Sequence, residues 1–103
     1  MQRKALDPCR IKFDVGQIVI TPAASAALEA NGQTIDELLA RHSAGDWGDV
    51  TDQVRIVNQR GLVEHFNLQS AYPLGDGPRL VVVTNSQRTL TLVHLDGRLV
   101  GSD

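Results

Sequence analysis

The residues of this chain that could do chemistry gather in one segment, Arg41-His42-Ser43-Ala44-Gly45-Asp46-Trp47-Gly48-Asp49-Val50. An imidazole and two carboxylates, from His42, Asp46 and Asp49, form a ligand set that suits a divalent metal. Gly45 and Gly48 argue against the regular helix that would bring those side chains onto one face, because glycine favours turns. Aspartates beside glycines are typical of turn chemistry. We therefore predict no metal ligands among these residues.

Other side chains with catalytic chemistry are scattered. His65 and His94 belong to different predicted elements, and the sequence leaves open whether either approaches His42. The single cysteine, Cys9, excludes an internal disulfide and a multi-cysteine zinc site. The chain contains no Gly-rich phosphate loop, no Gly-x-Ser-x-Gly motif and no His-Glu-x-x-His motif. We predict no catalytic residues and no cofactor.

The charge balance disfavours nucleic acid as a partner. The formal net charge is −2 over 103 residues, whereas phosphate binding draws on concentrated Lys and Arg. Arg79, Arg88 and Arg98 flank predicted strands and could form a small basic patch, but solvated hairpin ends are the more ordinary interpretation. The apolar fraction of 42% is typical of a globular protein, and no apolar run approaches the roughly 20 residues that cross a bilayer. We expect a soluble, cytoplasmic protein without a membrane segment.

The predicted elements that position these residues give an α+β fold. We expect a flexible N-terminal arm over residues 1–12 and a single domain over residues 13–103. In that domain, a short N-terminal strand and two or three helices pack on a C-terminal antiparallel meander of three to four strands.

Three helix starts are marked by capping residues. Thr21-Pro22 predicts the first helix, because threonine caps a helix and proline suits its first position. Thr34 and Glu37 have the spacing of a capping box, which predicts a second helix. Asp49 or Thr51 caps the third, whose end near Gly61 the sequence leaves open.

The strands are predicted from residue type and alternation. Gln17–Ile20 is β-branched and predicts a short buried strand. Residues 66–74 alternate, and Arg79–Thr84 is apolar on both faces, which is typical of a central strand. Residues 89–95 follow, and Asp96-Gly97 predicts a hairpin into a last strand over Arg98–Val100.

The lone tryptophan predicts an anchor in the core. A single large aromatic most often packs inside, so we expect Trp47 to be substantially buried where the second helix ends. His42 closes the apolar stripe of that helix and is expected to be a partly buried histidine with a satisfied hydrogen bond.

Three stretches carry a resemblance: Phe13-x-x-Gly16-Gln17-Ile18-Val19-x-Thr21-Pro22, Leu38-Leu39-x-Arg41-His42-x-x-Gly45-Asp46-Trp47-Gly48-Asp49, and Ser70-Ala71-Tyr72-x-Leu74. Over roughly residues 13–95 the chain resembles an uncharacterised family of short bacterial proteins carried on plasmids and integrated elements, often called plasmid-related proteins. The resemblance implies a mobile-element setting and a shared fold, without an established activity. The chain departs from the family pattern at Thr84-Asn85-Ser86-Gln87-Arg88 and in its tail, Asp96-Gly97-Arg98-Leu99-Val100.

The leading functional hypothesis is a small non-enzymatic accessory protein of a mobile element that binds an unidentified protein partner. Its predicted binding surface is the 45–49 loop with the adjacent sheet edge, through Arg41, His42, Asp46, Trp47 and Asp49. A nuclease-like toxin that uses His42, Asp46 or arginines is one alternative. A nucleic-acid-binding regulator is another. The sequence leaves the oligomeric state open.

Overall fold

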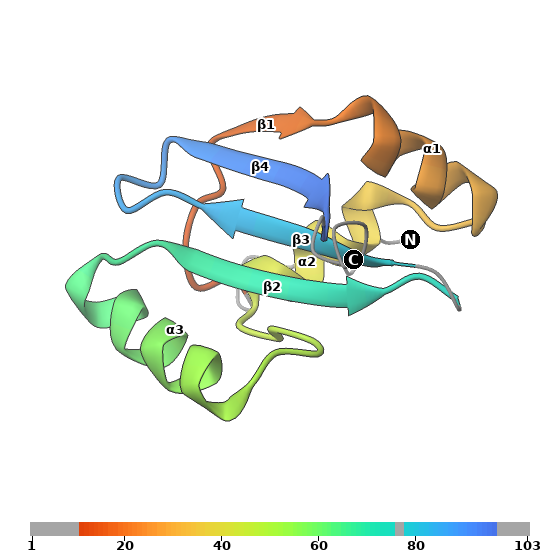
Figure 1. Ribbon diagram of the computed structural model, residues 1–103. Coiled ribbons are helices and arrows are strands. Elements are labelled where there is room, and N and C mark those ends of the chain that lie inside the picture. Colours follow the sequence, from red (N-terminus) through yellow and green to blue (C-terminus); the bar gives the residue numbers. More distant parts are fainter. Residues whose placement is uncertain (1–10, 76–77, 97–103) are drawn as a thin grey trace.

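The structure, a computed structural model, describes residues 11–75 and 78–96. Its elements in chain order are β1 (Gln17–Ile20), α1 (Pro22–Ala30), α2 (Ile35–Ser43), α3 (Asp52–Glu64), β2 (Leu68–Pro73), β3 (Arg79–Thr84) and β4 (Leu90–Leu95), as Figure 1 shows. Most of the predicted flexible arm and the predicted strand over Arg98–Val100 lie outside the described residues. Lys12, at the end of that arm, donates its backbone N–H to Ser43 O over 2.7 Å.

The four strands form one mixed sheet in the order β1-β4-β3-β2. β2, β3 and β4 are an antiparallel meander, which confirms the predicted α+β class and the central place of Arg79–Thr84. β1 joins the other side of the sheet parallel to β4. The prediction that Gln17–Ile20 is buried is wrong, because an edge strand has one neighbour and the helices cover only its alternate residues.

One face of the sheet is covered by α1 and α2. In Figure 1 this helical side faces away from the viewer around α2, and the strands pass in front of it. The core between the two layers is formed by buried side chains of both, namely Ala24, Leu28, Leu38, Tyr72, Leu74, Leu80, Val82 and Val93. Ala24 is fully buried, and the alanines of α1 let that helix lie close to the sheet.

Each helix begins after a threonine whose hydroxyl accepts a backbone hydrogen bond. The acceptors and donors are Thr21 and Ala24 N (3.2 Å), Thr34 and Glu37 N (3.4 Å), and Thr51 and Val54 N (3.1 Å). The third cap is therefore Thr51 and not Asp49. α3 continues past Gly61, which is buried, and ends where His65 takes a left-handed conformation with φ 60°.

α3 lies along the β2 edge and closes a second, smaller core. Phe13, Trp47 and Leu68 are buried there, with Val50 and Leu62 packed against them. Only Asn58 and Gly61 of α3 are fully buried, so most of its surface faces solvent. Among the described helices, none combines the length and the apolar character that crossing a membrane requires.

Candidate functional site

The 45–49 loop docks against β2 and extends the sheet by one bridge. Ala71 N donates to Trp47 O over 3.0 Å, and Asp49 N donates to Ala71 O over 2.6 Å. Gly48 between them has φ +74°, and a Cβ at this position would lie 2.3 Å from Ala71 O. The loop conformation therefore requires glycine here, both for the backbone angle and for the close approach to the strand.

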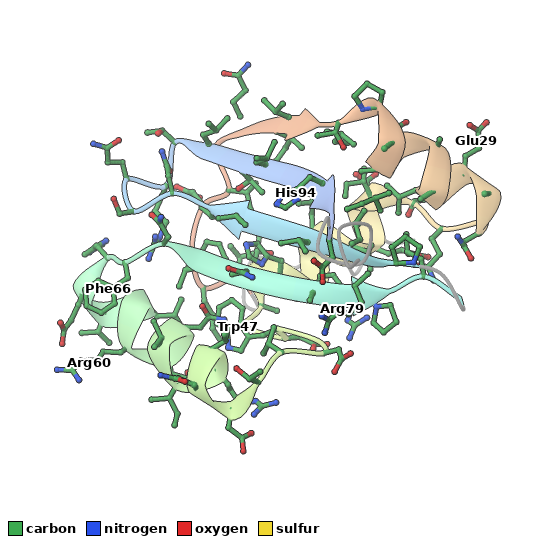
Figure 2. All side chains as sticks on the ribbon, viewed as in Figure 1. Glu29, Trp47, Arg60, Phe66, Arg79 and His94 are labelled. Carbon is green, nitrogen blue, oxygen red and sulfur yellow. The ribbon has the colours of Figure 1, made fainter. Side chains whose placement is uncertain are left out.

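Trp47 is buried, as predicted, with 4% of its surface exposed. Its ring stacks on Phe13 at a centroid distance of 6.2 Å and meets the His42 ring edge-on at 5.8 Å. The indole Nε1 is buried and has no hydrogen-bond partner among the described residues. Figure 2 places Trp47 at the β2 side of the molecule beside α3. Trp47 therefore anchors the loop, and its ring is not presented to a partner.

Arg41 and Asp46 form an ion pair on the solvent side of the loop. Arg41 Nε donates to Asp46 Oδ2 over 2.8 Å, and the guanidinium lies 4.5 Å from the centre of the Tyr72 ring. This hydrogen bond lowers the pKa of the Asp46 carboxyl and raises that of Arg41. Asp46 also accepts from Gly48 N over 3.3 Å, and its backbone carbonyl accepts from the Tyr72 hydroxyl over 2.6 Å. Both charged groups remain about half exposed.

His42 lies at the centre of a buried chain of hydroxyl groups. It has 0% exposure, and burial, followed by the charge of Arg88, lowers its pKa to about 3, so the ring is neutral. Nδ1 lies 2.5 Å from Ser70 Oγ, and Nε2 lies 2.9 Å from Thr84 Oγ1. The expectation of a partly buried histidine understated its burial.

The donor and the acceptor of each hydrogen bond around His42 can be assigned in turn. Thr91 Oγ1 donates to Val15 O over 2.7 Å, because a carbonyl can only accept. Thr91 must then accept from Thr84, 2.6 Å away, and Thr84 must accept from His42 Nε2–H. Because the ring is neutral, Nδ1 carries a lone pair that accepts from Ser70. Each hydrogen of the chain has one acceptor, which fits a structural role for His42.

The structure separates the candidate catalytic residues. His42 and Ser70 resemble a nucleophile and its base, but both have 0% exposure. His94 lies on the opposite face of the sheet, and His65 caps the end of α3. No group of three His, Cys, Asp or Glu side chains within residues 11–75 and 78–96 is placed to hold a metal.

The face of the sheet opposite α1 and α2 carries several exposed apolar side chains, a feature that the sequence prediction missed. Its exposed apolar side chains are Val19 (41% exposed), Leu90 (40%) and Leu92 (37%), and Val57 of α3 (45%) stands beside them. By the strand register, Val19, Leu92 and Val83 lie side by side across three strands. We call Val19, Val57, Val83, Leu90 and Leu92 the apolar face. Figure 1 looks onto this side of the sheet.

The alternation in β4 is the signal that could have revealed the apolar face. Thr91 points inward and is fully buried, whereas Leu90 and Leu92 point outward. A strand with one face in water ordinarily turns its leucines inward and its threonines outward. Thr91 shares its side of the strand with Val93 and Leu95, which pack in the core, so the alternation places Leu90 and Leu92 on the outside.

Three connected hollows follow the boundary between α3 and the apolar face. They have volumes of about 300, 250 and 200 Å³. Gln69 and Val83 line both of the larger two, and Val83 also lines the smallest, together with Leu90 and Leu92. The hollows therefore form one groove, which is apolar at the β4 hairpin end and polar near Asp49.

At its polar end the groove is not a site for an anion. Arg79 donates to Asp49 Oδ2 over 3.5 Å and to Asp96 Oδ2 over 3.0 Å, so two carboxylates offset its charge. His94 Nδ1 donates to Leu95 O over 2.8 Å, because a carbonyl can only accept. Figure 2 labels Arg79 and His94 on this side of the sheet. The prediction that Arg79 is a solvated hairpin end is wrong, since it is half-buried and paired.

The prediction of a solvated hairpin end is also wrong for Arg88. Its guanidinium donates to Phe66 O over 2.7 Å and to Gly61 O over 2.9 Å, so it ties the β3–β4 turn to the end of α3. Arg98, the third predicted member of a basic patch, lies outside the described residues. Arg79 and Arg88 thus serve internal contacts and do not form a basic patch.

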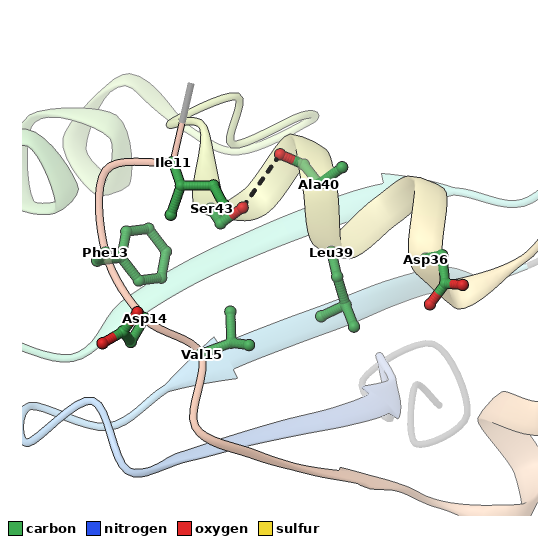
Figure 3. A pocket seen from close by; sticks show the side chains of 8 residues that line it. All are labelled: Ile11, Phe13, Asp14, Val15, Asp36, Leu39, Ala40 and Ser43. Carbon is green, nitrogen blue, oxygen red and sulfur yellow. Dashed lines mark hydrogen bonds between the residues drawn. The ribbon is translucent and has the colours of Figure 1, made fainter. Parts of the chain in front are cut away.

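A further hollow of about 180 Å³ lies between α2 and the segment before β1. Figure 3 shows apolar side chains from both segments around it, including Phe13, Val15 and Leu39. The Ser43 hydroxyl donates to Ala40 O over 3.3 Å and so is engaged by its own helix. The hollow is small and apolar, and Asp14 and Asp36 are the ionisable side chains that line it.

Comparison of the chain with protein-family models, with curated proteins and with solved structures finds no match. The resemblance to short plasmid-borne proteins therefore stays a prediction.

Proposed function

We propose that this protein is a non-enzymatic binding module that docks a protein partner on the apolar face. The observation that carries the proposal is the outward side of β4, which exposes Leu90 and Leu92 although Thr91, Val93 and Leu95 of the same strand face the helical layer. Exposed apolar patches with a polar rim are characteristic of interaction sites. Contact with water does not by itself favour leucine at exposed positions of a strand. The mobile-element setting belongs to the proposal and rests on the sequence resemblance.

The chemistry of the surface favours a protein partner over a nucleic acid. All five arginines that the structure describes are engaged. Four of them, Arg41, Arg55, Arg60 and Arg79, are in ion pairs, and Arg88 binds carbonyls. Phosphate binding would require these pairs to break. The partner that fits is a segment with apolar side chains for the groove beside Val57 and Val83.

The proposed surface differs from the loop that the sequence indicated. Trp47 and His42 lie in the interior, so they act on binding only by holding the sheet in shape. Arg41, Asp46 and Asp49 remain at the surface, and Asp49 also lines the polar end of the groove. Of the five loop residues, Asp49 is therefore the one that lies next to the proposed docking site.

Site-specific photo-crosslinking in a bacterial host tests the proposal. A photoreactive residue at Leu92 should capture a discrete partner band, whereas the same residue at the exposed Glu29 of α1 should not. Leu90→Glu should abolish capture from position 92, because a carboxylate on the apolar face two residues from Leu92 opposes apolar docking. Equal capture from both positions, or capture unaffected by Leu90→Glu, would refute the proposed surface.

The enzymatic alternative is tested with the purified protein. Cleavage of RNA or DNA that disappears in His94→Gln while the fold persists would contradict a non-enzymatic role. His94 is the relevant position because it lines the groove, whereas His42 is enclosed.

A further inference from the structure

The two edges of the sheet, β2 and β1, differ in whether their outward backbone groups are hydrogen-bonded. At the β2 edge, the Asn58 side-chain amide donates to Gln69 O over 2.8 Å and accepts from Gln69 N over 3.1 Å. The 45–49 loop satisfies both backbone groups of Ala71. Pro73, the next residue with this orientation, has no N–H. The β2 edge is therefore closed to another strand.

Among the described residues, none pairs with the outer edge of β1. Gln17 N donates to Thr89 O over 2.9 Å and Thr21 N donates to Val93 O over 3.0 Å, so these two residues turn their N–H groups toward β4. By the two-residue period of a strand, Ile18 and Ile20 turn their N–H and C=O groups away from the sheet. No described residue bonds to these outward groups. The strand also has neither a charged residue nor a proline, which are common means of blocking an edge.

We propose that β1 pairs with β1 of a second copy of this chain, antiparallel and about a twofold axis at Val19. In this register Ile18 lies opposite Ile20 of the other copy, and the two outward-facing residues of each strand exchange both of their hydrogen bonds. The pairing uses all the outward backbone groups of Ile18 and Ile20 and makes four hydrogen bonds.

The side chains of β1 suit this symmetric pairing. Val19 would meet Val19 of the second copy on the apolar face, and Ile18 would meet Ile20 on the helical side. Both contacts are between β-branched residues, which are favourable cross-strand pairs. The exposed side chains in the first turns of α1, next to the strand, are those of Pro22, Ala23, Ser25 and Ala26, none of which is long or charged.

The pairing would join two sheets into one of eight strands and make the two apolar faces continuous through Val19. The inference does not rest on the proposed function, because it concerns the edge of β1 and not the face of the sheet. The residues that test the two proposals also differ, since Leu92 belongs to β4 and takes no part in the edge.

The test is the solution mass of the purified full chain, measured by sedimentation equilibrium and light scattering over a range of concentrations. The wild type should approach twice the chain mass of 11.2 kDa. Ile18→Pro removes an outward N–H that β4 does not use, and Val19→Lys places two positive charges at the axis. Both variants should sediment as monomers. Val63→Lys, a matched change at a site that is 77% exposed on α3, should leave the mass unchanged.

Charge complementation makes the test specific to the axis. Val19→Asp alone should also be monomeric, and an equimolar mixture of Val19→Asp with Val19→Lys should recover the double mass. Circular dichroism verifies that each variant is folded. A monomeric wild type, or a dimer that survives both Ile18→Pro and Val19→Lys, would overturn the inference. A dimer lost with Leu92→Glu but retained in Ile18→Pro would assign self-association to the apolar face instead.

Discussion

Ser70 Oγ lies 2.5 Å from His42 Nδ1, and this contact joins α2 to β2 across 28 positions of sequence inside a region closed to water. Because the ring is neutral, the serine donates and the imidazole accepts. The opposite nitrogen binds Thr84 of the central strand. The second helix is thus held on the sheet by directed polar contacts as well as by apolar packing.

The burial of His42 predicts a stability that depends on pH. The pKa of His42 is lowered to about 3 in the fold, whereas an unfolded histidine titrates near 6.5. Between these values the unfolded chain binds a proton that the folded chain does not, so stability is full above the unfolded pKa and is lost as the pH falls toward the folded pKa. We expect the free energy of unfolding to fall by up to about 1.4 kcal/mol per pH unit below about pH 6.

Urea denaturation between about pH 7 and about pH 5, where most carboxylates stay ionised, isolates this effect. His42→Gln should lose the histidine part of the slope, whereas His65→Gln, at an exposed position, should retain it. An identical slope in wild type and His42→Gln would show that His42 does not carry the pH dependence.

Replacement of Trp47 is expected to cause a large loss of stability. Trp47→Ala removes a ring that packs on Phe13 and His42, which should lower the free energy of unfolding by roughly 3–5 kcal/mol. Trp47→Phe keeps much of the packing and removes the unpaired Nε1, so it should lose clearly less. Thermal melts compare the two. Equal losses would mean that ring size is not what anchors the loop.

A pair of glycine variants tests how the loop docks on β2. Gly48 and Gly32 both have positive φ, at +74° and +66°, but a Cβ meets Ala71 O at 2.3 Å in the first case and nothing within 4 Å in the second. Gly32→Ala should cost about 1 kcal/mol through backbone strain alone. Gly48→Ala should cost several times more, because the loop must leave the strand. Similar melting temperatures for the two variants would contradict the docked loop.

Replacement of Asn58 tests whether its side chain closes the β2 edge. Asn58→Asp replaces a donor to Gln69 O with a second acceptor in a site that is 2% exposed, which should cost about 2–4 kcal/mol. Gln59→Glu makes the matched change on the exposed neighbouring residue and should stay within about 0.5 kcal/mol of wild type. Urea denaturation measures both. A tolerated Asn58→Asp would indicate that the amide does not bind the strand.

Local signals predicted most of the elements correctly. The threonine caps at Thr21 and Thr34 depend only on residues three positions apart, and both are present. The alternation of residues 66–74 likewise placed Leu68, Ser70 and Tyr72 on one buried face. Trp47 could be predicted to be buried because its size alone makes full exposure unfavourable.

The remaining features depend on contacts between distant residues. Whether β1 is central or at an edge depends on which strand it joins, and its partner is β4, more than 70 positions later in the chain. The inward orientation of Thr91 follows from His42 and Val15, which no local pattern links to it. The alternation of β4 shows that Leu90 and Leu92 share one side of the strand, but which side faces outward depends on these distant contacts.

The chain of hydroxyl groups around His42 also favours the observed register of β4 over an alternative register of the same strand. Sliding β4 by one residue would turn Leu90, Leu92 and His94 toward the helices and would turn Thr91, Val93 and Leu95 toward water, so it would exchange one pair of apolar side chains for another. In that alternative, Thr84 would lose Thr91, the acceptor of its hydrogen bond, and a buried unpaired polar group costs about 1–3 kcal/mol. The chain of hydroxyl groups thereby favours the observed register, and this register keeps Leu90 and Leu92 on the surface where we propose that a partner docks.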